Sequence, residues 1–275
     1  LEFRRVLFRS ETSMRSISKF SHLATWACLI IALAACSGTP THNPTTFPYD
    51  IDEEKIARDK IKIVVIPHVN LNGFSRSYLE EEAPRIDGYV STYLKENGYK
   101  VLPQRVFIQH WNNAVRAFGN PLDPTSGKVN MKSFSQIMQS VRDEMVKSSN
   151  LDAFVFTDLV EFEVSFSAGL KHLARWDGVS RKPSLQGPGD GVSSDFDWNM
   201  QAAVASIQIS IFDSQLQRLF LGRGGMDATE AIDTRSSTGR YIRRRNVLEN
   251  KENVMEGIML AFHPFIPFED WPGTP

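Results

Sequence analysis

The sequence contains very little cysteine. Only Cys28 and Cys36 occur among its 275 residues, and both lie close to the amino terminus. The chain after Cys36 therefore has no thiol for a disulfide bond or a thiolate metal site. Its stability has to come from a hydrophobic core, and a content of 41% hydrophobic residues in a chain of this length is enough to build one.

The sequence also lacks a large excess of charge of either sign. It has 31 basic and 32 acidic residues, a net charge of −1. The first 35 residues hold five basic and two acidic residues (Arg4, Arg5, Arg9, Arg15, Lys19; Glu2, Glu11), so 26 basic and 30 acidic residues follow, a net charge of −4. This balance argues against a nucleic-acid partner and against general electrostatic docking on anionic lipid.

The familiar motifs of several enzyme classes are absent as well. The chain has no Gly-x-Ser-x-Gly elbow, no His-Glu-x-x-His and no phosphate-binding loop that ends in Gly-Lys-Ser or Gly-Lys-Thr. The segment from Asp195 to Asn199 begins like a calcium-binding loop, but Met200 stands where that loop needs glycine and Ser206 where it needs glutamate. We therefore expect a protein that is not an enzyme and that needs no cofactor or metal ion.

Two weaker catalytic candidates stay open. His68 follows the first predicted strand, a position where α/β domains often place functional loops, although a single loop histidine is usually structural or solvated. Glu161 and Glu163 lie two residues apart on a predicted strand, so they share one face of it and could form a carboxylate pair. A solvated strand edge is the simpler interpretation of the two glutamates.

An export signal is the clearest feature that the sequence does contain. Arg15 and Lys19 precede an apolar stretch over 20–32, and Leu33-Ala34-Ala35-Cys36 follows at once. The stretch is shorter than the roughly 20 residues that a permanent membrane-spanning helix needs. This pattern is typical of the lipobox of bacterial lipoproteins. Small residues precede a cysteine, and a diacylglycerol group can alkylate the thiol of that cysteine. The pattern predicts cleavage before Cys36 and lipidation of Cys36, and a plain secretory signal cut elsewhere is the alternative.

The lipobox divides the chain into four expected regions. Residues 1–13 include LEFRRVLFRS, which resembles the translation of a short-read sequencing adapter, so we expect Met14 to be the natural start. Residues 14–35 are the predicted signal peptide. Residues 36–59 are the predicted lipidated cysteine and a flexible tether rich in Pro, Thr and Asn. Residues 60–275 are predicted to form one globular domain.

Hydrophobic periodicity predicts the fold of that domain. Apolar residues at helical spacing indicate three helices, over 79–94, 134–145 and 247–262, and Pro84 suggests that the first ordered helix begins there. Buried or alternating runs indicate strands over 61–67, 99–102, 152–167, 203–212 and 216–221. The order predicts a single layered α/β domain with a mixed sheet, helices packed on the sheet, and a C-terminal antiparallel hairpin followed by a helix. The segment 169–200 is the least regular, and 186–191 is expected to be a surface loop.

The densest positive charge lies just before the last helix. Arg240, Arg243, Arg244 and Arg245 could bind an anionic group, such as a lipid headgroup, a glycan phosphate or an acidic patch on a partner. The alternative is a solvated basic loop that compensates three nearby carboxylates, Asp227, Glu230 and Asp233.

Three segments, KIKIVVIP, LDAFVFTDLVEF and ASIQISIFDSQLQRLFLGRGG, together resemble a group of envelope domains. The group comprises the curli secretion-channel lipoprotein, the amino-terminal domain of the Tol-Pal translocation protein, and the lipoprotein activators of penicillin-binding proteins. The resemblance covers most of 61–262 and consists of pattern and order, without a diagnostic motif. It implies a compact α/β domain that binds other envelope proteins, and it assigns no functional residue.

The resemblance and the lipobox together suggest a non-catalytic, lipid-anchored periplasmic adaptor that helps to assemble or regulate an envelope structure. Two alternatives remain at this point. A secretion pore would need long strands of about ten alternating residues, and 169–200 does not alternate. An envelope hydrolase acting on glycan or lipid would need a cleft that brings His68 together with two acidic groups. Ser37 and Gly38 after the lipidated cysteine are not acidic, which favours the outer membrane, facing the periplasm.

Replacement of Cys36 tests the lipobox directly. We expect Cys36→Ala to abolish labelling with radioactive palmitate and to leave the precursor uncleaved, because the acylated thiol is what the lipoprotein peptidase recognises. Ser37→Asp serves as the paired variant, since it should keep the lipid but move the protein into inner-membrane fractions. A Cys36→Ala protein that is labelled and processed as before would contradict the lipoprotein assignment.

Overall fold

The computed structural model describes residues 48–52, 56, 60–67, 69, 77–123, 128–167, 172–189 and 191–268. The predicted signal peptide, Cys36 and His68 lie outside these residues, so the roles assigned to them stay predictions. Among the described residues, no helix combines the length and the apolar character needed to cross a membrane.

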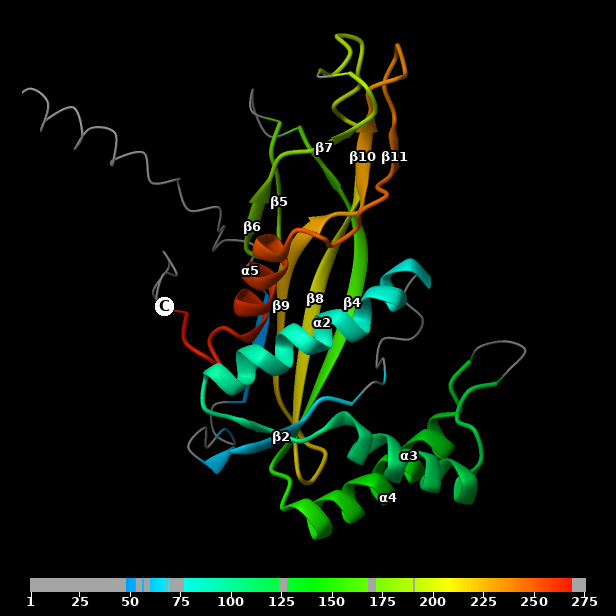
Figure 1. Cartoon of the computed structure of the whole chain (residues 1–275), viewed down its shortest axis with the longest axis vertical. Coiled ribbons are helices and arrows are strands. Elements are labelled where there is room, and N and C mark those ends of the chain that lie inside the picture. The colour runs from blue at the N-terminus through cyan, green and yellow to red at the C-terminus, as the bar shows by residue number, and fades with distance from the viewer. Residues whose placement is uncertain are drawn as a thin grey trace, which may run out of the picture. The chain divides into compact units, whose positions relative to one another are not determined.

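A six-stranded mixed sheet forms the centre of the domain (Figure 1). Its order is β1-β9-β8-β4-β2-β3. The strands are β1 (Tyr49–Ile51), β2 (Ile63–Val65), β3 (Lys100–Val101), β4 (Ala153–Ser165), β8 (Gln201–Asp213) and β9 (Arg218–Ala228). Strand β2 pairs in parallel with β3 and β4, whereas β4, β8, β9 and β1 pair antiparallel. The predicted mixed sheet, with parallel strands first and an antiparallel hairpin later, is confirmed.

The long pairing of β4 with β8 sets which residues face each side of the sheet. It runs from Ala153 opposite Asp213 to Ser165 opposite Gln201. Because successive side chains of a strand point to opposite faces, Ile207, Ile209 and Ile211 share one face, and all three are fully buried.

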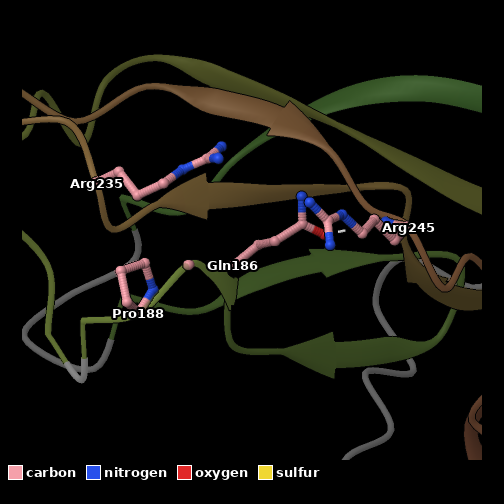
Figure 2. Close-up of a pocket in the computed structure, with 5 residues that line it drawn as sticks. Gln186, Pro188, Arg235 and Arg245 are labelled. Atoms are coloured by element: carbon pink, nitrogen blue, oxygen red, sulfur yellow. Dashed lines mark hydrogen bonds between the residues drawn. The ribbon is translucent and has the colours of Figure 1, made fainter.

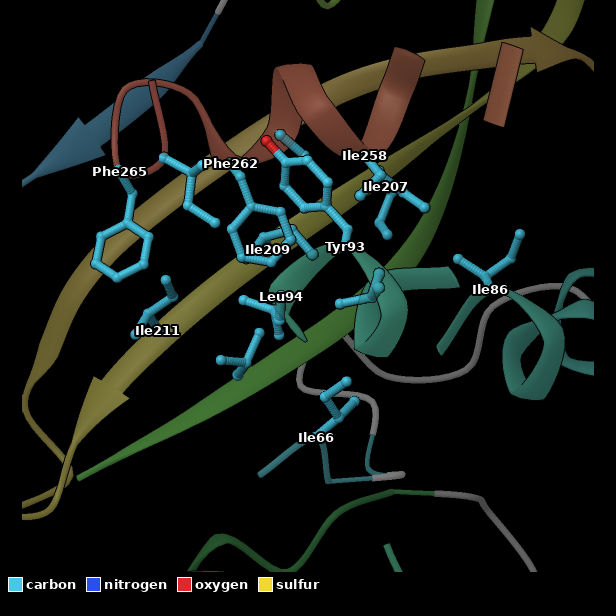
Figure 3. Close-up of a cluster of buried hydrophobic side chains, with 14 of the residues drawn as sticks. Ile66, Ile86, Tyr93, Leu94, Ile207, Ile209, Ile211, Ile258, Phe262 and Phe265 are labelled. Carbon is cyan, nitrogen blue, oxygen red and sulfur yellow. The ribbon is translucent and has the colours of Figure 1, made fainter. Parts of the chain in front are cut away.

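Helices α2 (Ser77–Glu96) and α5 (Lys251–Phe262) cover that face (Figure 3). Figure 3 shows Tyr93 and Leu94 of α2 and Ile258 and Phe262 of α5 around the three strand isoleucines. The rings of Tyr93 and Phe262 lie 5.5 Å apart between centroids, so the two helices contact each other as well as the sheet.

Helices α3 (Gln104–Phe118) and α4 (Met131–Ser149) pack on the opposite face, over the beginning of β4. Phe154 and Phe156 of β4 face them and join a second cluster, whose helical members are Phe107, Ala114, Ile137, Met138, Val141 and Met145. Helix α3 was not predicted from the sequence, although Phe107, Trp111, Ala114 and Val115 have helical spacing and Pro103 stands at its N-cap.

Two smaller sheets complete the domain. A hairpin of β5 (Ala174–Trp176) and β6 (Val179–Arg181) packs against β8 and β9. A three-stranded sheet has the order β11-β10-β7, with β7 (Ser184–Gln186), β10 (Glu230–Asp233) and β11 (Tyr241–Arg243). The irregular segment 169–200 therefore contains three short strands, and Gly187 to Gly189 lie on the surface as predicted.

Two predicted boundaries are wrong. The tether was expected to extend to residue 59, but Tyr49–Ile51 pairs with β9 as an edge strand, and Asp50 forms an ion pair with Arg218 at 2.9 Å. Pro84 lies inside α2 and does not begin it. Pro84 and Glu80 are both exposed, so the Glu80 carbonyl, which loses its amide partner at Pro84, faces water.

Small residues let α5 approach β9 very closely. A Cβ atom on Gly224 would overlap the carbonyl oxygen of Gly257 in α5, and one on Gly222 would overlap the carbonyl oxygen of Ala261. On the other face of the same strand, a Cβ atom on Gly225 would overlap Val179 of the β5–β6 hairpin. Gly222 and Gly224 therefore leave no room for a side chain on the α5 side of β9, and Gly225 leaves none on the hairpin side.

We expect Gly224→Ala to lower the free energy of unfolding by about 1–3 kcal/mol or more, because the added methyl group must displace backbone atoms of α5. Urea denaturation of the full chain measures this. Gly88→Ala is the matched control, because a Cβ atom on Gly88 in α2 meets nothing within 4 Å and alanine should raise stability by up to about 1 kcal/mol. Equal stabilities of the two variants would show that the close approach of α5 is not required.

Candidate functional site

The predicted arginine cluster is divided among several internal partners. The Arg244 guanidinium lies 2.7 Å from Asp227, and Arg240 lies 3.7 Å from Asp233. The guanidinium carbon of Arg243 lies 3.9 Å from the centroid of the Tyr78 ring, a cation–π contact. Since Asp227 and Asp233 are buried carboxylates, Arg244 and Arg240 compensate charge inside the domain. The third predicted carboxylate, Glu230, accepts a hydrogen bond from the Ala203 amide.

Arg245 is placed differently from the other three. Its backbone amide donates to the Gln186 side-chain oxygen at 3.0 Å, and the Gln186 side-chain amide donates to the Arg243 carbonyl at 3.2 Å. The Arg245 side chain lines a cavity of about 330 Å³, whose other lining residues are Gln186, Gly187, Pro188 and Arg235 (Figure 2). We call this the arginine cavity.

Arg235 was not among the predicted site residues. It lies in the connection between β10 and β11, and its Nε atom donates to Asp233 Oδ1 at 2.8 Å. The hydrogen bonds from Arg235 hold the pKa of the Asp233 carboxyl below its usual value. Because Asp233 is almost fully buried and accepts this hydrogen bond, it orients the Arg235 side chain. Only the pairing of β10 with β7 brings Arg235 to the same cavity as Gln186.

The wall of the arginine cavity is a constrained turn. The Thr234 amide donates to the Gln186 carbonyl at 3.1 Å, and the Gly189 amide donates to the Thr234 hydroxyl at 3.1 Å. Gly187 has a φ of 139°, and a Cβ atom there would overlap the Thr234 hydroxyl. The turn therefore requires glycine at this position and exposes its backbone to the cavity.

Exposed apolar side chains flank the connection between α3 and α4. Among the described residues, seven large hydrophobic side chains are exposed, and four of them lie between the last residue of α3 and the first residue of α4: Phe118, Leu122, Val129 and Met131. Leu122 and Val129 form a β-bridge, and the Asn130 amide donates to the Pro121 carbonyl at 2.7 Å. Met131 is the most exposed of the seven, at 67%. We call these four residues the α3–α4 tip.

A buried acid lies in the turn of the β5–β6 hairpin. The Trp176-Asp177-Gly178 segment is a turn with a packed aromatic ring, and the Trp176 ring nitrogen donates to the Ala205 carbonyl at 3.4 Å. The Ser206 hydroxyl donates to Asp177 at 2.6 Å, and Arg223 lies 4.0 Å from the same carboxylate oxygen. These groups join the hairpin to β8 and β9.

Burial raises the pKa of the Asp177 carboxyl, while the Ser206 hydrogen bond and the Arg223 charge act in the opposite direction. Asp177 is 8% exposed and its polar partners belong to the packed strands. Asp177 therefore has a structural role, because its contacts connect the β5–β6 hairpin to β8 and β9.

Of the weaker catalytic candidates, Glu161 and Glu163 lie among the described residues and His68 does not. Glu161 accepts hydrogen bonds from the hydroxyl groups of Tyr78 and Thr229, whereas Glu163 is exposed. His172 stacks on Trp198 with 3.4 Å between ring centroids. Within the described ranges, no group of three or more His, Cys, Asp or Glu side chains is arranged to hold a metal ion.

No protein-family model matches the chain, and comparisons with curated proteins and with solved structures give no match. The resemblance to the group of envelope lipoproteins therefore stays a prediction that rests on the order and pattern of the segments in the sequence.

The raised pKa of Asp177 predicts a pH-dependent stability. A carboxyl whose pKa is higher in the folded state stabilises the fold below its unfolded pKa of about 3.9, and this contribution is lost as the pH rises through the folded pKa. Asp177→Asn stays neutral, and asparagine tolerates the φ of 39° at this position. We therefore expect the variant to gain stability relative to the wild type between about pH 4 and about pH 7.

Urea denaturation at the two pH values measures the difference. Glu163→Gln, which removes an exposed carboxyl from β4, is the control variant measured alongside. A difference between Asp177→Asn and the wild type that stays constant from pH 4 to pH 7 would contradict the assignment.

Proposed function

We propose that this chain is a lipid-anchored adaptor of the bacterial envelope. It binds another envelope protein through the α3–α4 tip and helps to assemble or regulate an envelope structure, without catalysing a reaction. The lipobox at Cys36 supports the anchor, and the residues after it favour the outer membrane with the domain in the periplasm.

The observation that carries the proposal is the α3–α4 tip. Exposed hydrophobic side chains that are scattered singly are normal on a monomer, whereas several together mark an interaction surface. Phe118 and Met131 are side-chain types that are enriched in protein interfaces, and the flexible methionine can adapt to the shape of a partner.

Charged residues at the tip indicate the chemistry of the partner. Arg116 lies in the last turn of α3, and Lys132 follows Met131 in the first turn of α4, and both are exposed. An apolar surface with an acidic rim would match the tip in both its hydrophobic centre and its charge. A second copy that docked tip to tip would bring the same basic residues, Arg116 and Lys132, together, so it is a poorer match than an acidic-rimmed partner.

The anchor would act by confining the domain to the membrane surface. Eleven residues separate Cys36 from Pro48, the first described residue before β1. Fully extended, they reach at most roughly 40 Å. A partner embedded in or attached to the same membrane would therefore meet the domain at a raised effective concentration.

Site-specific photocrosslinking in cells tests the proposal. We expect benzoylphenylalanine in place of Met131 to give one main adduct with an envelope protein, because Met131 is the most exposed apolar side chain of the tip. Mass spectrometry of the crosslinked peptides then shows whether the contacted surface is apolar with acidic residues around it. Phe118→Asp in the same chain should reduce the adduct about 10-fold or more, since a charge would be buried in the interface.

Leu185 provides the matched control position. It is 45% exposed but lies on β7, away from the tip, so the same probe there should not give that adduct. An adduct with a second copy of the chain, with lipid, or with equal yield from Leu185 would contradict the proposal. Cys36→Ala should lose the adduct if anchoring supplies the local concentration.

A further inference from the structure

We propose that the arginine cavity binds a phosphate group carried by a small ligand. This proposal goes beyond the adaptor function and does not depend on the lipid anchor or on the α3–α4 tip. It rests on the position of two guanidinium groups, on the contacts that hold them in place, and on the local charge.

The two guanidinium groups enter the cavity from different segments. Figure 2 shows Arg235 and Arg245 extending toward each other from opposite sides, with the Gln186 side chain and Pro188 below them. A guanidinium group is a planar fork that matches a pair of oxygen atoms. A carboxylate offers one such pair, whereas a tetrahedral phosphate can present oxygen pairs to two forks at once.

The Arg235 guanidinium and the backbone of Arg245 are held before any ligand binds. Asp233 accepts from the Nε atom and from the backbone amide of Arg235, at 2.8 and 3.1 Å. Gln186 holds the backbone of Arg245 through its side-chain oxygen at 3.0 Å. Thr234 fixes the Gly187–Gly189 turn that forms the wall. A site whose parts are already ordered loses less conformational entropy when the ligand binds.

The local charge favours an anion, in contrast to the chain as a whole. Residues 226–245 contain five arginines and three acidic residues, a local charge of +2. Asp227 and Asp233 are already paired with Arg244, Arg235 and Arg240. Arg245 therefore adds positive charge to the cavity without a neighbouring carboxylate among its lining residues.

The size of the cavity limits the ligand. About 330 Å³ is more than a phosphate ion needs and stands at the lower end of the range for small-molecule sites. The phosphate therefore belongs to a small compound or to the headgroup of a phospholipid. The ring of Pro188 offers an apolar surface to the remainder of such a ligand.

Binding of sn-glycerol 3-phosphate to the full chain in dodecyl maltoside micelles, which carry no phosphate, tests the proposal, with isothermal titration calorimetry as the readout and inorganic phosphate as a second probe. We expect saturable binding that Arg245→Ala and Arg235→Ala each weaken about 10-fold or more, because each removes a charge-assisted pair of hydrogen bonds. Arg245→Lys keeps the positive charge but lacks the planar fork of the guanidinium group, so its affinity should lie between those of the wild type and Arg245→Ala.

Arg218→Ala is the matched control, because Arg218 is an exposed arginine at the start of β9 that pairs with Asp50 outside the cavity. The affinity of this variant for sn-glycerol 3-phosphate should lie within about 2-fold of the wild-type affinity. Thermal melting of each variant confirms that it is folded. The proposal would be overturned if neither probe showed saturable binding. It would also be overturned if Arg218→Ala weakened the binding as much as Arg245→Ala does.

A second arm identifies the source of the phosphate. The same titration is repeated with phosphatidylglycerol added to the micelles. A weaker apparent affinity for sn-glycerol 3-phosphate, lost in Arg245→Ala, means that lipid headgroups compete for the cavity. An unchanged affinity means that the ligand is a soluble phosphate compound, and either result upholds the phosphate site. Because no partner protein takes part, failure of the adaptor proposal leaves this test unaffected.

Discussion

The close approach of α5 to β9 is the contact on which the rest of the domain depends. Glycines at 222, 224 and 257 remove the side chains that would otherwise separate the helix from the strand. The helix can then place Ile258 and Phe262 among the strand isoleucines of the main core. Gly225 faces the other way and receives the β5–β6 hairpin, so one short segment of β9 serves both faces of the sheet.

The position of the β5–β6 hairpin determines where the next strand, β7, can pair. Docking of β5–β6 brings the next strand, β7, to pair with β10, and this pairing places Gln186 beside the segment that carries Arg235 and Arg245. The arginine cavity thus depends on a strand pairing that joins Gln186 to a segment about 50 residues later in the sequence. At the other end of the β4–β8 pairing, α3 and α4 pack over Phe154 and Phe156, and their connection forms the α3–α4 tip. The two proposed binding surfaces therefore lie near opposite ends of one long strand pair.

Buried carboxylates explain why four nearby arginines have different roles. Asp227 and Asp233 lie on β9 and β10 in positions that exclude water, so each requires a cation. Arg244 pairs with Asp227, Arg235 and Arg240 pair with Asp233, and Arg243 stacks on Tyr78. Compensation of nearby carboxylates therefore describes Arg244 and Arg240, and binding of an anion at Arg245 stays a proposal.

The sequence by itself determined the alternation of β4 and β8, the parallel start of the sheet, the antiparallel hairpin and the helices α2, α4 and α5, because periods of 2 and 3.6 residues are local properties of strands and helices. It also indicated the lipobox, which is a linear motif. Only the tertiary structure decided that Tyr49–Ile51 joins the sheet and that Arg235 meets Arg245. The strand is too short to show a period, and the two arginines meet through long-range strand pairing, so neither leaves a local pattern in the sequence.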